Sequence, residues 1–260
     1  MTPFEQQFLN DLYQSGGFYT ALNSTGKRVG PLVGYAGTYG EEKLQFVGDV
    51  YANCAKMEEN ISLLRNTICD IKTTVQDYIY ASDMAYALSS RNNHHIVWLG
   101  APMGGITTAM LLALNVFQEK TVYGFLEKKV VEFATQTSRE KSVLNFGRHT
   151  ISAGDVVVPV EDVCNNFSTT DKMIKLIFAN GGRIPFIFCL INRSGKKSFS
   201  FQSEQFGNQV IPIVSIVLAN WPEYKQDDPE IKDYIAEPGK LVLNPKQNWD
   251  KLMLDMANRK

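Results

Sequence analysis

Residues 156–170 read Val-Val-Val-Pro-Val-Glu-Asp-Val-Cys-Asn-Asn-Phe-Ser-Thr-Thr. The first five residues are apolar, which is typical of a strand that is buried on both faces of a sheet. Two carboxylates follow, and amide and hydroxyl side chains then lead into a predicted helix over residues 171–180. A buried strand that runs through a polar loop into a helix indicates one half of a parallel βαβ unit.

Further apolar runs of strand length lie before and after this stretch. They cover residues 95–99, 122–126, 184–191 and 209–217. Helical patterns occupy residues 106–117, and residues 50–88 with a break near 60–66, whereas residues 127–145 are polar and show no apolar stripe. Strands that alternate with helices at this spacing predict an α/β fold with a mostly parallel, doubly wound sheet.

The composition is that of a globular protein. Of the 260 residues, 44% are hydrophobic and 20% are charged, which excludes disordered and fibrous classes. Lysine and arginine total 26 against 27 acidic residues, a net charge of -1, so we expect neither nucleic acid nor a membrane as a partner. The apolar runs are too short to span a bilayer, and no apolar signal segment opens the chain, which predicts a cytoplasmic location.

Four polar segments directly follow predicted strands. They are Gly100–Gly105, Glu127–Lys129, Glu161–Thr170 and Asn192–Gly195. Ligands of open parallel sheets bind beyond the carboxyl ends of the strands, so we expect these segments to line one binding edge. Small residues in the first segment leave backbone N–H groups accessible, which favours a cradle for pyrophosphate over a simple packing turn.

The third segment has the chemistry to bind a ribose 5-phosphate. Glu161 and Asp162 can accept hydrogen bonds from vicinal sugar hydroxyls, and the N-terminus of the following helix favours a phosphate. Further donors come from Asn165, Asn166, Ser168, Thr169 and Thr170. An acidic strand end followed by an ordinary helix cap explains the same residues, and both interpretations stay open on this segment alone.

The segment resembles the phosphoribosyl-diphosphate signature of type I phosphoribosyltransferases, and its Glu-Asp-Val version is most similar to that of orotate phosphoribosyltransferase. Other parts of the family pattern have counterparts in the same order, over residues 20–218. They are Thr25–Pro31 (an N-terminal loop), Leu99–Ala109 (the pyrophosphate loop), Tyr123–Lys129 (the strand that opens the catalytic loop) and Gly182–Gly195 (a strand that ends near the base).

The resemblance implies a pentosyltransferase, that is, a glycosyltransferase that joins a nitrogenous base such as orotate to ribose 5-phosphate from phosphoribosyl diphosphate and releases pyrophosphate. It assigns catalytic roles to Lys128, Lys129 and Asp162. Substrate-binding roles fall to Gly104, Gly105, Glu161, Asp162, Asn165, Asn166, Ser168, Thr169, Arg193 and Lys27. Mg²⁺ is the implied cofactor, carried by the substrate and not by a metal site of the protein, and the implied assembly is a homodimer.

The same resemblance predicts a phosphoribosyltransferase-like domain over residues 1–218, with a hood within 1–50, and a C-terminal extension over 219–260 packed on it. Several positions depart from the family pattern. Asn165-Asn166-Phe167 stands where the signature has Thr-Thr-Gly, and Gly104 stands where the pyrophosphate loop has lysine. The Arg-Lys pair of the family is replaced by Glu127-Lys128 or Lys128-Lys129. These departures support an alternative, a non-catalytic module that binds phosphoribosyl diphosphate or a nucleotide and has a regulatory role.

Overall fold

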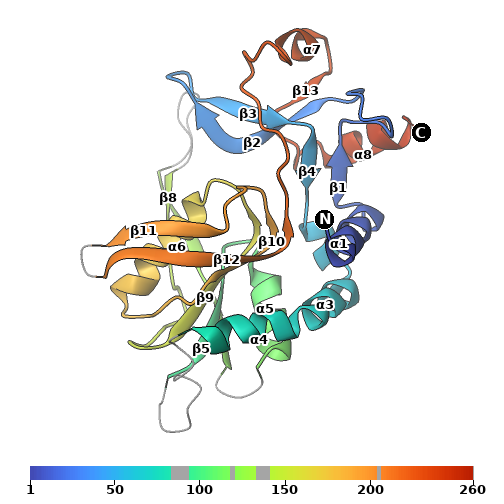
Figure 1. Cartoon of the computed structure of the whole chain (residues 1–260). Helices are drawn as coiled ribbons and strands as arrows, with labels where there is room; N and C mark the ends of the chain where they lie inside the picture. The colour runs from blue at the N-terminus through green and yellow to red at the C-terminus, as the bar shows by residue number, and fades with distance from the viewer. Residues whose placement is uncertain (83–93, 118–120, 133–140, 204–205, 260) are drawn as a thin grey trace. The chain divides into compact units, whose positions relative to one another are not determined.

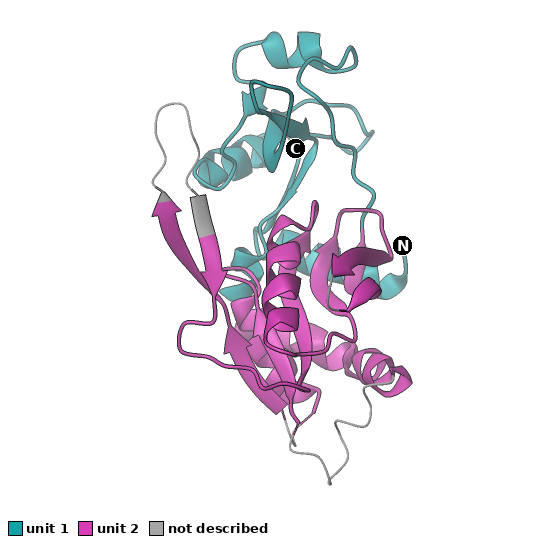
Figure 2. Ribbon diagram, turned by 90° about the vertical axis from the view of Figure 1, so that its left-hand side faces the viewer, with its two compact units in different colours: residues 1–60, 219–260 teal, residues 61–218 magenta. Residues whose placement is uncertain are grey.

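A computed structural model of the chain describes residues 1–82, 94–117, 121–132, 141–203 and 206–259. The chain divides into two compact units, coloured separately in Figure 2. One unit consists of Met1–Asn60 with Ala219–Lys260, and the other of Ile61–Leu218. The predicted C-terminal extension starts at residue 219, as does the second segment of the first unit. However, residues 1–60, which were predicted to belong with residues 61–218, group with residues 219–260. The predicted division into a hooded domain and an extension stays a prediction.

The second unit is built on a six-stranded sheet with the order β11-β12-β10-β9-β5-β6 (Figure 1). The strands are β5 (Ile96–Gly100), β6 (Thr121–Phe125), β9 (Val156–Cys164), β10 (Ile187–Asn192), β11 (Ser198–Ser203) and β12 (Gly207–Leu218). Every neighbouring pair is parallel except β11 with β12, which is antiparallel. The predicted α/β class with a mostly parallel sheet is confirmed.

The helical connections run toward opposite edges of the sheet, starting from the central strands β5 and β9. Helix α5 (Ile106–Asn115) leads from β5 to β6, and α6 (Ser168–Ala179) leads from β9 to β10 on the other side of the sheet order. Right-handed crossovers in opposite directions place the two helices on opposite faces, so the sheet is doubly wound. Helices α3 (Ile61–Asp70) and α4 (Lys72–Ala81) precede β5. None of the described helices has the length and apolar character needed to cross a membrane.

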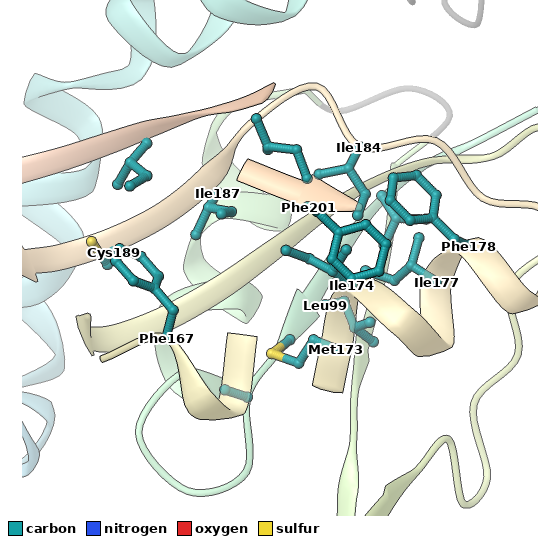
Figure 3. Close-up of a cluster of buried hydrophobic side chains, with 14 of the residues drawn as sticks. Leu99, Phe167, Met173, Ile174, Ile177, Phe178, Ile184, Ile187, Cys189 and Phe201 are labelled. Carbon is teal, nitrogen blue, oxygen red and sulfur yellow. The ribbon is translucent and has the colours of Figure 1, made fainter. Parts of the chain in front are cut away.

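A core of buried apolar side chains lies between α6 and the sheet (Figure 3). Helix α6 contributes Met173, Ile174, Ile177 and Phe178, whose spacing places them on one stripe of the helix. The sheet contributes apolar side chains of alternate strand positions, among them Val97, Leu99, Val157, Ile187 and Cys189. This packing fixes the axis of α6, and therefore the position of its first turn, relative to the carboxyl end of β9.

The first unit joins the two ends of the chain. Its elements are α1 (Pro3–Gln14), β1 (Phe18–Thr20), β2 (Leu32–Tyr39), β3 (Leu44–Gly48), β4 (Val50–Ala52), α2 (Ala55–Glu58), α7 (Lys232–Ala236), β13 (Leu241–Val242) and α8 (Trp249–Ala257). Strand β13 extends the β2–β3 hairpin in parallel with β2. The Trp249 indole donates a hydrogen bond to the Gly16 carbonyl at 3.1 Å, so the C-terminal helix is part of the N-terminal core.

One segment without a predicted element forms strands, and one helix prediction was wrong at its start. Residues 127–145 contain an antiparallel ribbon of β7 (Glu127–Glu132) and β8 (Lys141–Asn145), which uses exposed valines that form no buried stripe. The helical pattern over 50–88 begins with strand β4, which pairs with β1, and its described helices are separated at Glu59–Asn60 and at Ile71. Pairing with β1 overrode the helical pattern at the start of residues 50–88.

Replacement of Ile177 by alanine tests the α6 core. Ile177 is fully buried between the helix and the sheet, so Ile177→Ala removes buried apolar surface and leaves a cavity. We expect the free energy of unfolding to fall by about 2–5 kcal/mol in urea titrations. Lys172→Ala, an exposed change on the same helix, is the matched control and should change it by less than about 0.5 kcal/mol. Equal effects of the two changes would contradict this account of the core.

Candidate functional site

The four polar segments predicted at strand ends meet along one edge of the six-stranded sheet. The Ala101 N–H donates to the Val160 carbonyl at 2.8 Å, and the Leu126 N–H donates to the Gly100 carbonyl at 3.0 Å. On the other side of β9, the Arg193 N–H donates to the Cys164 carbonyl at 2.7 Å. Strands β5 and β9 are neighbours whose connections leave in opposite directions, so this edge contains the switch point at which open α/β sheets bind ligands.

The loop after β5 passes very close to the end of β9. A Cβ atom at Gly105 would overlap the Val160 carbonyl and lie 2.7 Å from the Ala101 nitrogen, so only glycine fits there. A Cβ atom at Gly104 would overlap the Asp162 carboxylate. The Asp162 side chain therefore lies directly against the backbone of the loop, in the space that a side chain at position 104 would need.

Met103 gives this loop an unusual backbone. Its φ is +70°, in the left-handed region, and its side chain is 82% exposed. That conformation costs a residue with a Cβ atom about 1–2 kcal/mol, and the exposed side chain recovers little of this cost by packing. Strained loop residues of this kind cluster at functional sites, which supports a ligand-binding role for the loop.

The two adjacent acids have different surroundings. Glu161 is 9% exposed, and its Oε1 atom accepts a hydrogen bond from the Thr170 hydroxyl of α6 at 3.0 Å. Asp162 is half-buried, and its Oδ1 atom accepts a hydrogen bond from the Val163 N–H at 2.8 Å. Successive strand residues point to opposite faces, so Glu161 lies toward α6 while Asp162 lies against Gly104.

The environment of Glu161 changes its protonation. Burial and, to a smaller extent, the neighbouring charge of Asp162 raise the pKa of Glu161 to about 8, against the opposing effect of the Thr170 hydrogen bond. Glu161 is therefore mostly protonated near neutral pH, and it can donate a hydrogen bond as well as accept one. Asp162 supplies the accessible carboxylate of the pair.

Cys164 lies next to these acids but lacks the properties of a nucleophile. A hydrogen bond with Cys189 and burial in the core both raise the pKa of the Cys164 thiol. Nucleophilic cysteines need the thiolate form, which this environment disfavours. The two buried cysteines therefore belong to the packing of β9 against β10.

Phe167 occupies the N-cap position of α6 with a left-handed backbone, φ +57° and ψ +17°. Its side chain is 5% exposed and its ring centroid lies 5.1 Å from that of Phe199 in β11. Figure 3 shows the ring among the core side chains, on the side of the sheet near Cys189. The loop thus has the backbone conformation that glycine favours, and the phenyl ring packs into the core.

The polar side chains of this loop have different exposures. Asn166 and Ser168 are exposed, and the Asn166 Oδ1 atom accepts a hydrogen bond from the Ser168 N–H at 3.2 Å. Asn165 and Thr169 are half-buried. Helix α6 begins at Ser168, three residues before the predicted start at 171, so its first turn carries these hydroxyl groups next to the end of β9.

The predicted cations are placed less closely together. Lys128 and Lys129 are exposed on β7, opposite Leu144 and Val143 of β8, and as successive strand residues they point to opposite faces of the ribbon. Arg193 is half-buried where β10 ends. Lys27 belongs to the other compact unit, where its N–H donates to the Asn23 side chain in an exposed loop.

Two residues of this edge had not been singled out from the sequence. Met103, inside the predicted segment Gly100–Gly105, shapes the loop beside Gly104, and Phe199 packs on Phe167. Phe199 had a sequence signal, because Ser198–Ser203 alternates polar and apolar residues as an edge strand does. Thr170, predicted as one of the donors of its loop, donates to Glu161. In the part of the chain that the structure describes, no three histidine, cysteine or acidic side chains are grouped to hold a metal ion.

Comparisons with known proteins give structural likeness but no sequence match. No family model and no curated protein matches the chain. An orotate phosphoribosyltransferase from Aeropyrum pernix is 18% identical, with a TM-score of 0.45 over 80% of this chain and 90% of that chain. An adenine phosphoribosyltransferase from Saccharomyces cerevisiae, solved with adenine and an imino-altritol bisphosphate, is 11% identical, with a TM-score of 0.47 over 82% and 99% of the two chains.

A third similar structure is an adenine phosphoribosyltransferase from Trypanosoma brucei in complex with AMP, pyrophosphate and ribose-5-phosphate. It is 13% identical, with a TM-score of 0.46 over 88% of this chain and 86% of that chain. These similar structures are all phosphoribosyltransferases. At such identities the likeness concerns the course of the chain, and any activity has to be argued from the residues of this chain itself.

The protonation of Glu161 predicts how stability depends on pH. Because its pKa is raised from 4.5 to about 8 on folding, the folded chain holds a proton that the unfolded chain releases between these values. The free energy of unfolding should therefore fall as pH rises from about 5 to about 8, with a slope of up to about 1.4 kcal/mol per pH unit from this group. Urea titrations at several pH values measure the slope.

Glu161→Gln should flatten that slope, because glutamine can keep the Thr170 hydrogen bond but does not titrate. Asp171→Asn, a change of a more exposed acid on the same helix as Thr170, is the control and should leave the slope as in the unchanged protein. Equal slopes in the Glu161→Gln variant and the unchanged protein would contradict a protonated Glu161.

Proposed function

We propose that this chain is a phosphoribosyltransferase that binds phosphoribosyl diphosphate at the carboxyl edge of β5 and β9. The observation that carries the proposal is the close approach of the Asp162 carboxylate to Gly104 at the switch point of the sheet. This approach brings a hydroxyl-binding group and a glycine-rich loop together, beside the first turn of α6. A sugar diol, a phosphate and a pyrophosphate each find suitable partners there.

The reaction replaces one bond at C1 of ribose by another. The bond from C1 to the pyrophosphate oxygen breaks, and both electrons leave with pyrophosphate. A base nitrogen forms the new bond to C1, and its proton, where it carries one, passes to solvent. Positive charge develops on the ribose ring and negative charge on the leaving group, so catalysis depends on placing the reactants and stabilising those charges.

The residues of the edge would share these roles. Asp162 accepts a hydrogen bond from a ribose hydroxyl, and Glu161, protonated, donates to or accepts from the neighbouring one. The loop that contains Gly104 and Gly105 holds pyrophosphate through its N–H groups, and the first turn of α6 holds the 5-phosphate. Lys128 or Lys129, on the β7–β8 ribbon, supplies a cation to the leaving group.

Mg²⁺ fits this set of donors as a substrate-borne ion. The edge offers oxygen ligands, among them the half-buried Asp162 carboxylate, and pyrophosphate with water supplies the remaining ligands that this hard cation prefers. When bound, the ion neutralises charge on pyrophosphate.

Arg193 favours an anionic base such as orotate or a related pyrimidine. A guanidinium at the end of β10 can hold a planar carboxylate or carbonyl through two parallel hydrogen bonds. Such a chain would act in pyrimidine nucleotide metabolism, in the cytoplasm and as a homodimer. A sedimentation measurement at micromolar concentration tests the dimer, and a monomeric mass would remove it.

A non-catalytic binding module is the second candidate. The observation in its favour is the loop Ala101–Gly105, whose sequence contains no lysine or arginine. At Gly104, where the family signature has lysine, the Asp162 carboxylate occupies the space that a side chain would need. A screen for pyrophosphate release, with phosphoribosyl diphosphate, Mg²⁺ and a panel of purine, pyrimidine and pyridine bases, separates the two candidates. Binding without release would favour the module.

Asp162→Asn tests the ribose assignment. Asparagine can keep the hydrogen bond from the Val163 N–H but loses the charge, and hydrogen bonds to charged groups contribute about 1.5–3 kcal/mol. We expect calorimetry to show phosphoribosyl diphosphate binding about 10- to 150-fold more weakly, with an unchanged melting temperature. Asp70→Asn, at an exposed acid of α3, is the control and should bind as the unchanged protein does. Unaltered binding in Asp162→Asn would remove Asp162 from the ribose site.

A further inference from the structure

The loop between β9 and α6 is held by an unusual combination of strain and burial at Phe167. A residue with a Cβ atom in the left-handed region is disfavoured by about 1–2 kcal/mol relative to its ordinary conformations. The phenyl side chain has no group that could cap the helix by a hydrogen bond, and it is buried in the α6 core. Its packing therefore helps to hold the strained conformation, beside the hydrogen bonds of the first turn.

The Phe167 ring packs against Phe199 of strand β11. Phe167 and Phe199 lie with ring centroids 5.1 Å apart and planes tilted by 41°, a favourable arrangement for two aromatic side chains. Strand β11 is the antiparallel edge strand, and it pairs with β12 through Phe199 and Ile211. The edge of the sheet is thus connected to the loop through two side chains.

The backbone of Phe167 in turn sets the first turn of α6. Its carbonyl accepts a hydrogen bond from the Asp171 N–H at 2.8 Å, the bond that starts the helix. The neighbouring Ser168 N–H is bound by Asn166. If Phe167 left the left-handed region, the direction of the chain through Asn165–Thr169 would change, and the polar groups of the loop would separate.

We infer that Phe167 is a positioning residue for the phosphate loop and that Phe199 is the anchor that keeps it in place. The inference rests on the proposed function, in which this loop binds the 5-phosphate of ribose 5-phosphate. Glycine would adopt the left-handed conformation without strain, whereas at Phe167 the burial of the ring stabilises the same conformation. The fraction of molecules whose loop can bind then depends on the packing of Phe199 against Phe167. When that fraction falls, the apparent affinity falls in proportion to it.

The test is a double-mutant cycle read by titration of ribose 5-phosphate. Phe199→Ala should weaken binding about five- to thirtyfold (about 1–2 kcal/mol) in the protein with Phe167, because the loop loses its anchor. In the Phe167→Gly background the same change should alter affinity less than twofold, because glycine adopts the left-handed conformation without an anchor. Phe167→Gly alone should bind as tightly as the unchanged protein or more tightly.

Phe201→Ala is the matched control. Phe201 lies two residues further along the same strand and is buried, but its ring packs on Phe178 at the other end of α6, with centroids 5.5 Å apart. It should lower the melting temperature at least as much as Phe199→Ala and leave the affinity for ribose 5-phosphate unchanged. If either alanine variant fails to fold, the leucine variants Phe199→Leu and Phe201→Leu give the same comparison with smaller expected effects.

The possible outcomes separate the inference from the proposed function. If the unchanged, folded protein does not bind ribose 5-phosphate, the proposed function fails first. If it binds and Phe199→Ala weakens binding equally in both backgrounds, or not at all, the positioning role of Phe167 is overturned while the site stands. If Phe201→Ala weakens binding as much as Phe199→Ala does, the effect is a general loss of stability and the inference is likewise overturned.

Discussion

The site depends on the register of strand β9 between its two parallel neighbours. Val160 lies opposite Gly100 of β5 and opposite Phe188 of β10. A slip of one residue would exchange the two faces, so that Asp162 would enter the α6 core and Glu161 would lie against the glycine loop. The buried Asp155 carboxylate helps to fix this register at the start of the strand, because it accepts hydrogen bonds from the N–H groups of His95 at 2.9 Å and Ser152 at 2.7 Å.

A proline inside this central strand is compatible with that register. Pro159 has no N–H group to give to a ladder, and prolines are usually confined to edge strands for that reason. Here β9 pairs with β5 through Pro159, opposite Leu99, but its ladder with β10 begins only at Val160. The strand can therefore be buried on both sides and still accommodate the ring.

The parts of the fold that depend on local pattern were predictable from sequence, and the parts that depend on distant partners were not. The runs that became β5, β9 and β10 are apolar over their whole length, and their polar ends marked the binding edge. The β7–β8 ribbon gave no such signal, because Val131 and Val143 are exposed and the pairing joins segments that are polar when taken separately. The opposite directions of Glu161 and Asp162 follow from strand geometry, but which of them meets Gly104 depends on register.

Phe167 shows why a departure from a sequence signature does not by itself decide whether a loop is lost. From sequence, a bulky residue at a glycine position suggests either a remodelled loop or a ring turned aside. In the folded chain the strain at φ +57° amounts to about 1–2 kcal/mol, whereas burial of a phenyl side chain contributes about 1.5–3 kcal/mol. The larger contribution is the burial, so the ring enters the core and the backbone takes the left-handed conformation. The shape of the loop is then a property of the α6 core, and it changes with the residues that pack beneath it.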